Sequence, residues 1–189
     1  MNEVLKAIAK RRSIRQFDPK QITDAELNAI LEAGVQAPSG HNDQSCYFTA
    51  IQNAELIKEL SEGSKLEMQK SPIPWISDLG KNEKLNIYYN APTIVIVAAK
   101  KGAVSPLADV CAAIENMMIA AVSFNIGSCW IGFSRFFFIN AESNGKVEIP
   151  ADYEVHYAIA LGYIPAHLKL TPPARKHDKP FHIIRDAKA

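Results

Sequence analysis

The sequence predicts an α+β or α/β sandwich in which helices pack on a small mixed β-sheet. Short apolar runs rich in β-branched residues are typical of buried strands, and the clearest of them is 93–99. Longer segments with apolar residues three and four positions apart are typical of helices. Turn-forming residues separate the segments, and 189 residues are most simply one domain, 1–189.

Four helices are predicted from their start signals, a capping residue followed by apolar residues at helical spacing. The N-cap residues are Asn2, Thr23, Asn53 and Ser105. Glu26 adds a capping box to the second helix, and Pro38 cannot continue that helix. The fourth helix, about 106–124, is apolar on almost every side, so we expect it at the centre of the molecule or at a contact between subunits.

Four strands are predicted, each short and largely apolar. They cover residues 47–51, 93–99, 127–133 and 155–163. Gly127 and Gly132 flank the third strand, and glycines in this setting usually mark a close approach to the backbone. Their spacing does not match the G-x-G-x-x-G fingerprint of dinucleotide-binding proteins. Residues 68–90 show no regular pattern, and we expect short helices or an excursion over a cleft there.

Charge is distributed unevenly along the chain. Residues 1–20 and 167–189 each carry a net charge of +4, the middle carries −7, and the whole chain carries +1. The basic ends are either solvated tails or two segments that meet at one anion. The basic residues lack interleaved aromatic residues, so a nucleic-acid partner is not expected.

The cysteine count favours a reducing compartment. Cys46, Cys111 and Cys129 are odd in number and widely spaced, which argues against a disulfide framework and against a zinc site. We see no pattern of a signal peptide and no apolar run long enough to span a bilayer. We therefore expect a cytoplasmic protein without a membrane partner.

Two segments carry the candidate binding residues. The segment 11–17 places three arginines and a serine within five residues at the end of a helix. Guanidinium groups and a hydroxyl suit a phosphate, but cations are also favoured at a helix C-terminus without any ligand. The segment 37–44 is rich in small and amide side chains. It is either a plain turn or the lining of a site for a polar, planar ligand.

Four stretches, in order, resemble the flavin mononucleotide (FMN)-dependent nitroreductase family. They are 11–17, 37–44, 127–132 and 160–165. Each is weak alone, and the match rests on their order. The resemblance implies a nitroreductase-like fold with a central mixed, mostly antiparallel sheet flanked by helices. It also implies a homodimer with the C-terminal segment exchanged between subunits and two FMN sites at the interface.

The resemblance further implies which residues bind FMN. From one subunit they are Arg11, Arg12, Ser13, Arg15, Trp130, Ile131 and Gly132. From the other they are Pro38, Ser39, Gly40, Asn42 and Gln44. The segment 11–13 would bind the phosphate and ribityl oxygens, Arg15 the pyrimidine edge, and the backbone of 130–132 would face the central ring. Arg175 or Lys176 would return to the phosphate, which would explain why both chain ends are basic.

Two departures from the family pattern stand out. This chain has Ser45-Cys46 where the family usually has Pro-Trp after the Asn-x-Gln segment. The C-terminal basic residues also do not fall on the family spacing. The transfer of a role to Arg175 or Lys176 is therefore the least direct part of the resemblance.

The implied activity is that of an NADH- or NADPH-dependent oxidoreductase. It would reduce nitroaromatics, quinones or similar small-molecule acceptors by ping-pong hydride transfer through flavin N5, without a catalytic side chain or a metal. One alternative is an FMN enzyme dedicated to a single metabolite, such as an enone reductase or a dehalogenase-like relative. Another is a flavin-binding redox sensor without turnover. Residues 68–90 and 136–138 are expected to set substrate choice.

Overall fold

The computed structural model describes residues 2–171 and 182–185, and its centre is a four-stranded sheet. The strands are β1 (Cys46–Ile51), β2 (Thr93–Lys100), β3 (Ile126–Ile131) and β4 (Tyr153–Tyr163). They lie in the order β1-β2-β4-β3, and every neighbouring pair is antiparallel. The parallel contribution is a single bridge between Ser13 and Ser128, so the predicted mostly antiparallel sheet is confirmed.

Five α-helices and three short 3-10 helices surround the described sheet. The α-helices are α1 (Glu3–Lys10), α2 (Asp24–Val35), α3 (Ala54–Gln69), α4 (Pro74–Lys81) and α5 (Pro106–Ser123). The 3-10 helices are η1 (Gly40–Asn42), η2 (Phe133–Phe136) and η3 (Ala141–Val147). The predicted caps on α1, α2 and α3 are present, whereas Ser105 occupies the N-cap position of α5 without a capping bond from its side chain.

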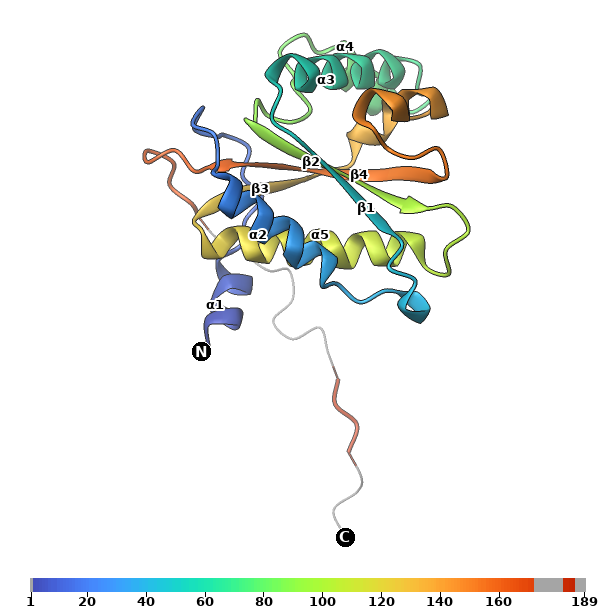
Figure 1. The fold of residues 1–189 in the computed structure, drawn as a ribbon. Coiled ribbons are helices and arrows are strands. Elements are labelled where there is room, and N and C mark those ends of the chain that lie inside the picture. Colours follow the sequence, from blue (N-terminus) through green and yellow to red (C-terminus); the bar gives the residue numbers. More distant parts are fainter. Residues whose placement is uncertain (1, 172–181, 186–189) are drawn as a thin grey trace.

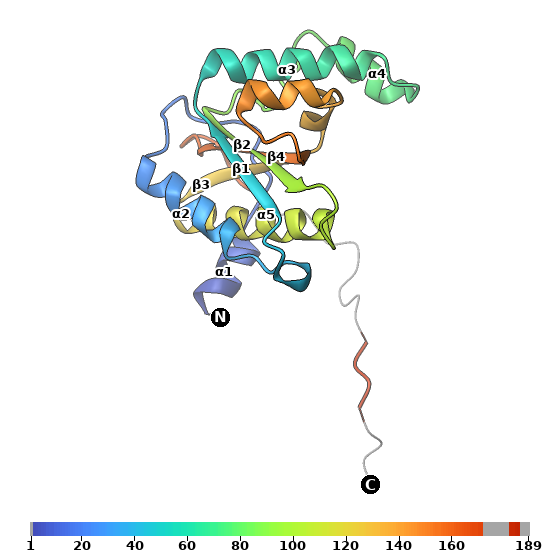
Figure 2. The same cartoon turned by 45° about the vertical axis from the view of Figure 1, so that its right-hand side comes forward.

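The sheet has a core on each face. Figure 1 shows α3 and α4 on one side of it and α2 and α5 on the other, and Figure 2 shows the same layers from a second direction. Alternate side chains of β2 point into the two cores, so Ile94 and Ile96 pack with α3 and α4 while Val95 and Val97 pack with α2 and α5. All four are fully buried, as the continuous apolar run predicts.

Helix α5 is the central helix of the fold. By length and composition it could cross a membrane, but Val110, Ile114 and Met117 are fully buried against the sheet in a core shared with α2. Its apolar character is therefore that of a core helix, which the sequence predicted as one of two possibilities.

Of the two alternatives expected for the segment 68–90, short helices or an excursion, the structure shows one short helix, α4, followed by irregular chain. Helix α4 packs closely on α3 because Gly80 leaves room; a Cβ there would lie 2.7 Å from the Lys65 carbonyl oxygen. Trp75 on α4 meets the ring of Phe133 edge-on, with 6.0 Å between ring centroids. The segment thus covers the end of β3, where η2 begins.

Helix α1 presents an apolar face that the described part of the chain leaves uncovered. Val4, Leu5 and Ile8 lie on one face as predicted, yet they are 62%, 50% and 46% exposed. Three exposed apolar residues on one helix face are typical of a surface that contacts another molecule.

Candidate functional site

The basic segment 11–17 lies beside the edge strand β3. The amide of Ile14 donates a hydrogen bond of 2.9 Å to the Ser128 carbonyl oxygen, next to the parallel bridge between Ser13 and Ser128. The amide of Asp18 donates to the Tyr163 carbonyl oxygen, also at 2.9 Å. The first bond holds the predicted segments 11–17 and 127–132 side by side, and the second joins the residue after 11–17 to the end of β4, within the predicted segment 160–165.

Two glycines make this close approach possible. Gly127 on β3 and Gly162 on β4 are partners in the sheet register. A Cβ on Gly127 would lie 2.9 Å from the Ile14 side chain, and one on Gly162 would lie 3.0 Å from the ring of Phe17. Both contacts are shorter than ordinary packing allows, so the basic segment can cross this corner of the sheet only where side chains are missing. The prediction of a close approach at Gly127 is confirmed.

A cavity of about 460 Å³ opens beside the basic segment. Arg12, Ser13, Arg15 and Gln16 line one side, and residues 168–171 line the other. Guanidinium groups, a hydroxyl and an amide are donors suited to an anion with several oxygens. The donor set therefore fits a phosphate, and the cavity has room for a ligand of nucleotide size.

Two of the arginines also have partners within the chain. Arg12 donates to the carbonyl oxygens of Ala9 and Arg11, at 2.8 and 2.5 Å, and so binds the C-terminal end of α1. Arg11 pairs with Glu115 on α5 at 3.3 Å. The hydrogen bonds of Arg12 therefore match the interpretation of this segment as cations at a helix C-terminus. The position of Arg12 on the cavity wall also matches the anion-binding interpretation.

Arg15 has a different environment. Its guanidinium carbon lies 5.7 Å from the centre of the Tyr89 ring, a cation–π distance. Interaction with Tyr89 raises the pKa of Arg15, and partial burial opposes that shift. Arg15 also lies near the thiol of Cys129, whose pKa is raised by burial, with Arg15 and Arg11 acting in the opposite direction.

The sequence did not single out Tyr89. It lies in the turn before β2, within the stretch 68–90 that shows no regular pattern. The available signal was a pair of tyrosines followed by Asn90 and, two residues later, Pro92. Without a fold nothing connects that pair to an arginine 74 residues away. Tyr89 joins the site through tertiary structure alone.

The end of β3 provides an accessible backbone. Ile131 is buried, Trp130 packs edge-on against Tyr157 with 5.2 Å between ring centroids, and Gly132 is exposed. A Cβ on Gly132 would meet nothing within 4 Å. The peptide groups here can therefore be approached by a flat ligand.

The loop 37–44 is rigidly held, but at a different place. The buried carboxylate of Asp109 on α5 accepts hydrogen bonds from the Gly40 amide at 2.9 Å and the Ser45 hydroxyl at 2.7 Å. Ser39 Oγ accepts from the Gln44 amide at 2.9 Å. Pro38, Ser39 and Gln44 of the loop also line a second cavity of about 220 Å³, whereas Gly40 and Asn42 do not.

The two groups of predicted residues lie near opposite ends of α5. Arg12 borders a cavity with Val122 and Asn125 at the C-terminal end, and Gly40 lies next to Ser105 at the N-terminal end. Seventeen helical residues between these points span about 25 Å at 1.5 Å per residue. In Figure 1, α1 and the turn that follows α2 are correspondingly far apart. One chain therefore does not bring the two groups together.

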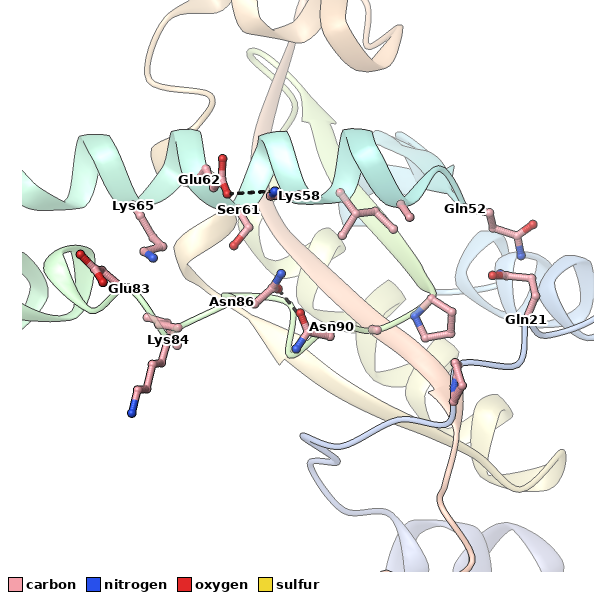
Figure 3. A pocket seen from close by; sticks show the side chains of 16 residues that line it. Gln21, Gln52, Lys58, Ser61, Glu62, Lys65, Glu83, Lys84, Asn86 and Asn90 are labelled. Atoms are coloured by element: carbon pink, nitrogen blue, oxygen red, sulfur yellow. Dashed lines mark hydrogen bonds and ion pairs between the residues drawn. The ribbon is translucent and has the colours of Figure 1, made fainter.

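A larger cavity, about 580 Å³, is lined by none of the predicted FMN-binding residues but by part of the segment 68–90, which is expected to set substrate choice. It lies between α3 and the segment 83–92 (Figure 3), where lysines and glutamates alternate and Lys58 pairs with Glu62 at 3.9 Å. Its charges largely compensate one another, and no group of donors converges on one point. We assign the candidate site to the cavity of about 460 Å³ beside the basic segment, because its charged donors are all positive and all suit an anion.

An antiparallel sheet between two helical layers, with a basic segment beside its edge strand, is consistent with what comparison with known proteins shows. Residues 8–163 match the sequence model of the Nitroreductase family, and the chain belongs to that family. A protein of Archaeoglobus fulgidus, provisionally named NADH dehydrogenase/NAD(P)H nitroreductase, is 33% identical over 168 residues, 86% of each chain.

Two solved structures resemble this chain over nearly its whole length. A nitroreductase with bound FMN from Bacteroides fragilis is 37% identical, with a TM-score of 0.91, over 98% of this chain and 100% of that one. A nitroreductase with bound FMN from Desulfitobacterium hafniense is 26% identical, with a TM-score of 0.85 and the same coverage. The predicted family and the nitroreductase-like fold are confirmed, whereas the exchange of the C-terminal segment between subunits stays a prediction. Arg175 and Lys176 lie outside the described residues, so their role stays a prediction.

Proposed function

We propose that this protein is an FMN-dependent NAD(P)H oxidoreductase that reduces nitroaromatics, quinones or similar small acceptors. The observation that carries the proposal is the hydrogen-bonded placement of segment 11–17 beside β3. It brings the donors of Arg12, Ser13 and Arg15 to one cavity beside β3, the strand that ends at the open backbone of Gly132. Family membership and the FMN bound in two related structures support the choice of cofactor.

The residues fit FMN in kind and in number. Arg12 and Ser13 would hold the phosphate and ribityl oxygens, and Arg15 would lie at the pyrimidine edge. Arg11 does not line the cavity and pairs with Glu115, so it would reach the phosphate only by leaving that partner. When bound, FMN would supply the hydride chemistry, and the protein would bind, orient and tune it. A guanidinium about 4 Å from a developing negative charge is worth up to about 4 kcal/mol at an effective dielectric constant of about 20. Arg15 would therefore favour the reduced cofactor.

We further propose that a second copy of the chain completes each site. The loop 37–44 is preorganised but lies near the wrong end of α5 to reach the basic segment of its own chain. The exposed face of α1 offers an interface. The described sheet also leaves β1 as an edge strand, to which a segment of another subunit could add. Ile183 and Ile184 near the C-terminus are 53% and 89% exposed, as expected for a segment that pairs with another subunit.

The first test is the spectrum of the purified protein and its response to reductants. We expect a yellow, dimeric protein whose flavin absorption is lost promptly on anaerobic mixing with NADH or NADPH. A panel of acceptors should then give ping-pong kinetics, since donor and acceptor would use one slot in turn. A yellow protein that neither coenzyme bleaches would be a sensor, and turnover of only one acceptor would indicate a dedicated enzyme. A colourless protein that takes up no added FMN would refute the proposal.

Arg15→Ala tests the assignment of the site. The substitution should leave the fold intact, because Arg15 is exposed, and should weaken the binding of reduced FMN about tenfold or more. Arg135→Ala is the matched control: Arg135 also lies 5.7 Å from an aromatic ring, that of Phe136, but does not line the cavity. Equal FMN affinity in the two variants would remove Arg15 from the site.

The free cysteines of the described chain suit the cytoplasm that we propose as its location.

A further inference from the structure

The turn 86–90 adopts a backbone conformation that needs an explanation. Tyr89 and Asn90 have φ angles of +56° and +55°, in the left-handed region. Asparagine tolerates this conformation, but in a tyrosine it brings Cβ too close to the following carbonyl oxygen, so the strain falls mainly on Tyr89. A strained conformation persists only where the surroundings impose it, and such turns are concentrated at functional sites.

The turn is anchored on both sides of Tyr89. Asn86 Oδ1 accepts hydrogen bonds from the amides of Tyr88 and Asn90, at 2.9 and 3.4 Å, and Figure 3 shows these two asparagines facing each other across the turn. The Ile87 amide donates to Ser61 Oγ at 3.0 Å. The buried hydroxyl of Tyr88 is hydrogen-bonded to Ser134 Oγ at 2.7 Å. The anchors join the turn to α3 and η2, so its shape is fixed.

The anchored turn presents Tyr89 to Arg15. Ile87 and Tyr88 are buried, 3% and 0% exposed, whereas Tyr89 is only partly buried and its ring lies within cation–π distance of the guanidinium. No carboxylate of the described chain pairs with Arg15, in contrast to Arg11 with its Glu115. Tyr89 also raises the pKa of Arg15, so the contact favours the charged guanidinium. Tyr89 is thus the neighbour that orients Arg15.

We propose that Tyr89 is a positioning residue of the cofactor site, which holds the Arg15 guanidinium toward the pyrimidine edge of bound FMN. This inference rests on the proposed function and adds a residue that the sequence motifs do not contain. It also explains the strain of the turn, because a relaxed backbone at Tyr89 would move its ring away from the guanidinium.

The test compares Tyr89→Ala and Tyr89→Phe with the wild-type holoprotein. A fixed cation interacts more strongly with reduced, anionic FMN than with oxidised FMN. Tyr89→Ala should therefore weaken the binding of reduced FMN about tenfold more than the binding of oxidised FMN. This difference lowers the two-electron midpoint potential of the bound cofactor by about 30 mV. Tyr89→Phe keeps the ring and should show about a threefold difference. The measurements are FMN titration of the apoprotein and anaerobic potentiometry against a reference dye.

Tyr47→Phe is the matched control, because the Tyr47 hydroxyl bonds the Glu148 carbonyl oxygen away from the cavity. It should change neither FMN affinity nor potential. If both Tyr89 variants weaken the two FMN forms equally and leave the potential unchanged, the residue is merely structural and the inference fails. If the wild-type protein takes up no FMN, the proposed function fails as well. Tyr89→Phe keeps the test valid should Tyr89→Ala not fold.

Discussion

Single residues decide whether the basic segment can reach the sheet. Arg15 and Ser13 are useful only because Gly127 and Gly162 lack side chains where Ile14 and Phe17 must lie. The residue-level chemistry of the arginines could be predicted from their spacing, since guanidinium groups clustered with a hydroxyl indicate an anion. Their geometry could not, because the partner glycines lie more than a hundred residues away.

Gly127→Ala should therefore damage the site and the fold together. Its Cβ would lie 2.9 Å from two carbons of the buried Ile14, and overpacking of this kind typically costs about 1–3 kcal/mol. We expect a lower urea midpoint and a loss of bound FMN. Gly145→Ala is the control, because a Cβ there meets nothing within 4 Å. If the two variants retain the same stability and FMN content, the glycine corner does not position the basic segment.

At the scale of elements, local signals predicted the helices and strands well. Caps at Asn2, Thr23 and Asn53 are confirmed because a capping bond spans three residues and leaves its signature in the sequence. The turn at 86–90 could not be predicted, because its anchors, Ser61 and Ser134, lie in distant elements. Local sequence does not encode strain that tertiary contacts impose.

The start of α2 carries a pH-dependent contribution to stability. The Glu26 carboxylate accepts from the Tyr163 hydroxyl at 2.6 Å and from the Thr23 amide at 2.9 Å. The Tyr163 bond first, and then the Thr23 bonds, hold the pKa of Glu26 below its usual value of 4.5. Because the folded pKa is lowered, the contribution is complete above the unfolded pKa and is lost as the pH falls through the folded value.

Glu26→Gln should accordingly lower the thermal midpoint at pH 7, and the deficit should shrink as the pH is lowered to about 4 and below. Tyr163→Phe removes the largest cause of the shift and should show a weaker pH dependence of the same sign. The measurement is thermal unfolding of the FMN-saturated protein by circular dichroism across this range. A deficit that stays constant with pH would show that the carboxylate charge is not what stabilises the helix start.

At the scale of the whole molecule, the two groups of residues predicted to bind FMN lie near opposite ends of α5. The layers and the sheet could be predicted from periodicity, because the apolar residues that form each core recur at helix or strand spacing within this one sequence. The division of the site followed only from the family resemblance, since no pattern within a sequence states which copy supplies a residue. The positions of Arg12 and Gly40 near opposite ends of one helix agree with such a division of the site between two copies.

Mixing two variants with weakened FMN binding tests this division, at a concentration of reduced FMN that fills the wild-type sites but those of neither variant alone. Arg15→Ala damages only the basic segment, and Ser39→Ala combined with Asn42→Ala damages only the loop. If each site takes its two parts from different copies, every mixed dimer has one intact site. Random reassociation should then restore about a quarter of the wild-type FMN sites. The measurement is bound FMN after the two proteins are unfolded and refolded together.

The control mixture combines Arg15→Ala with Arg12→Ala, which both damage the basic segment and should restore nothing. A loop mixture that also restores nothing would place both parts of the site in one subunit.

The uncovered face of α1 has a consequence for inheritance. If two copies share each site as proposed, a substitution in the loop 37–44 would disable one of the two FMN sites in a dimer with an undamaged copy. An organism bearing both alleles would then keep much of its enzyme activity. A substitution at Leu5 or Ile8 that prevents dimer formation would leave the wild-type subunits to form dimers with one another. Both kinds of damage would behave as recessive, and two different recessive alleles could rescue each other only when one of them lies in the loop and the other in the basic segment.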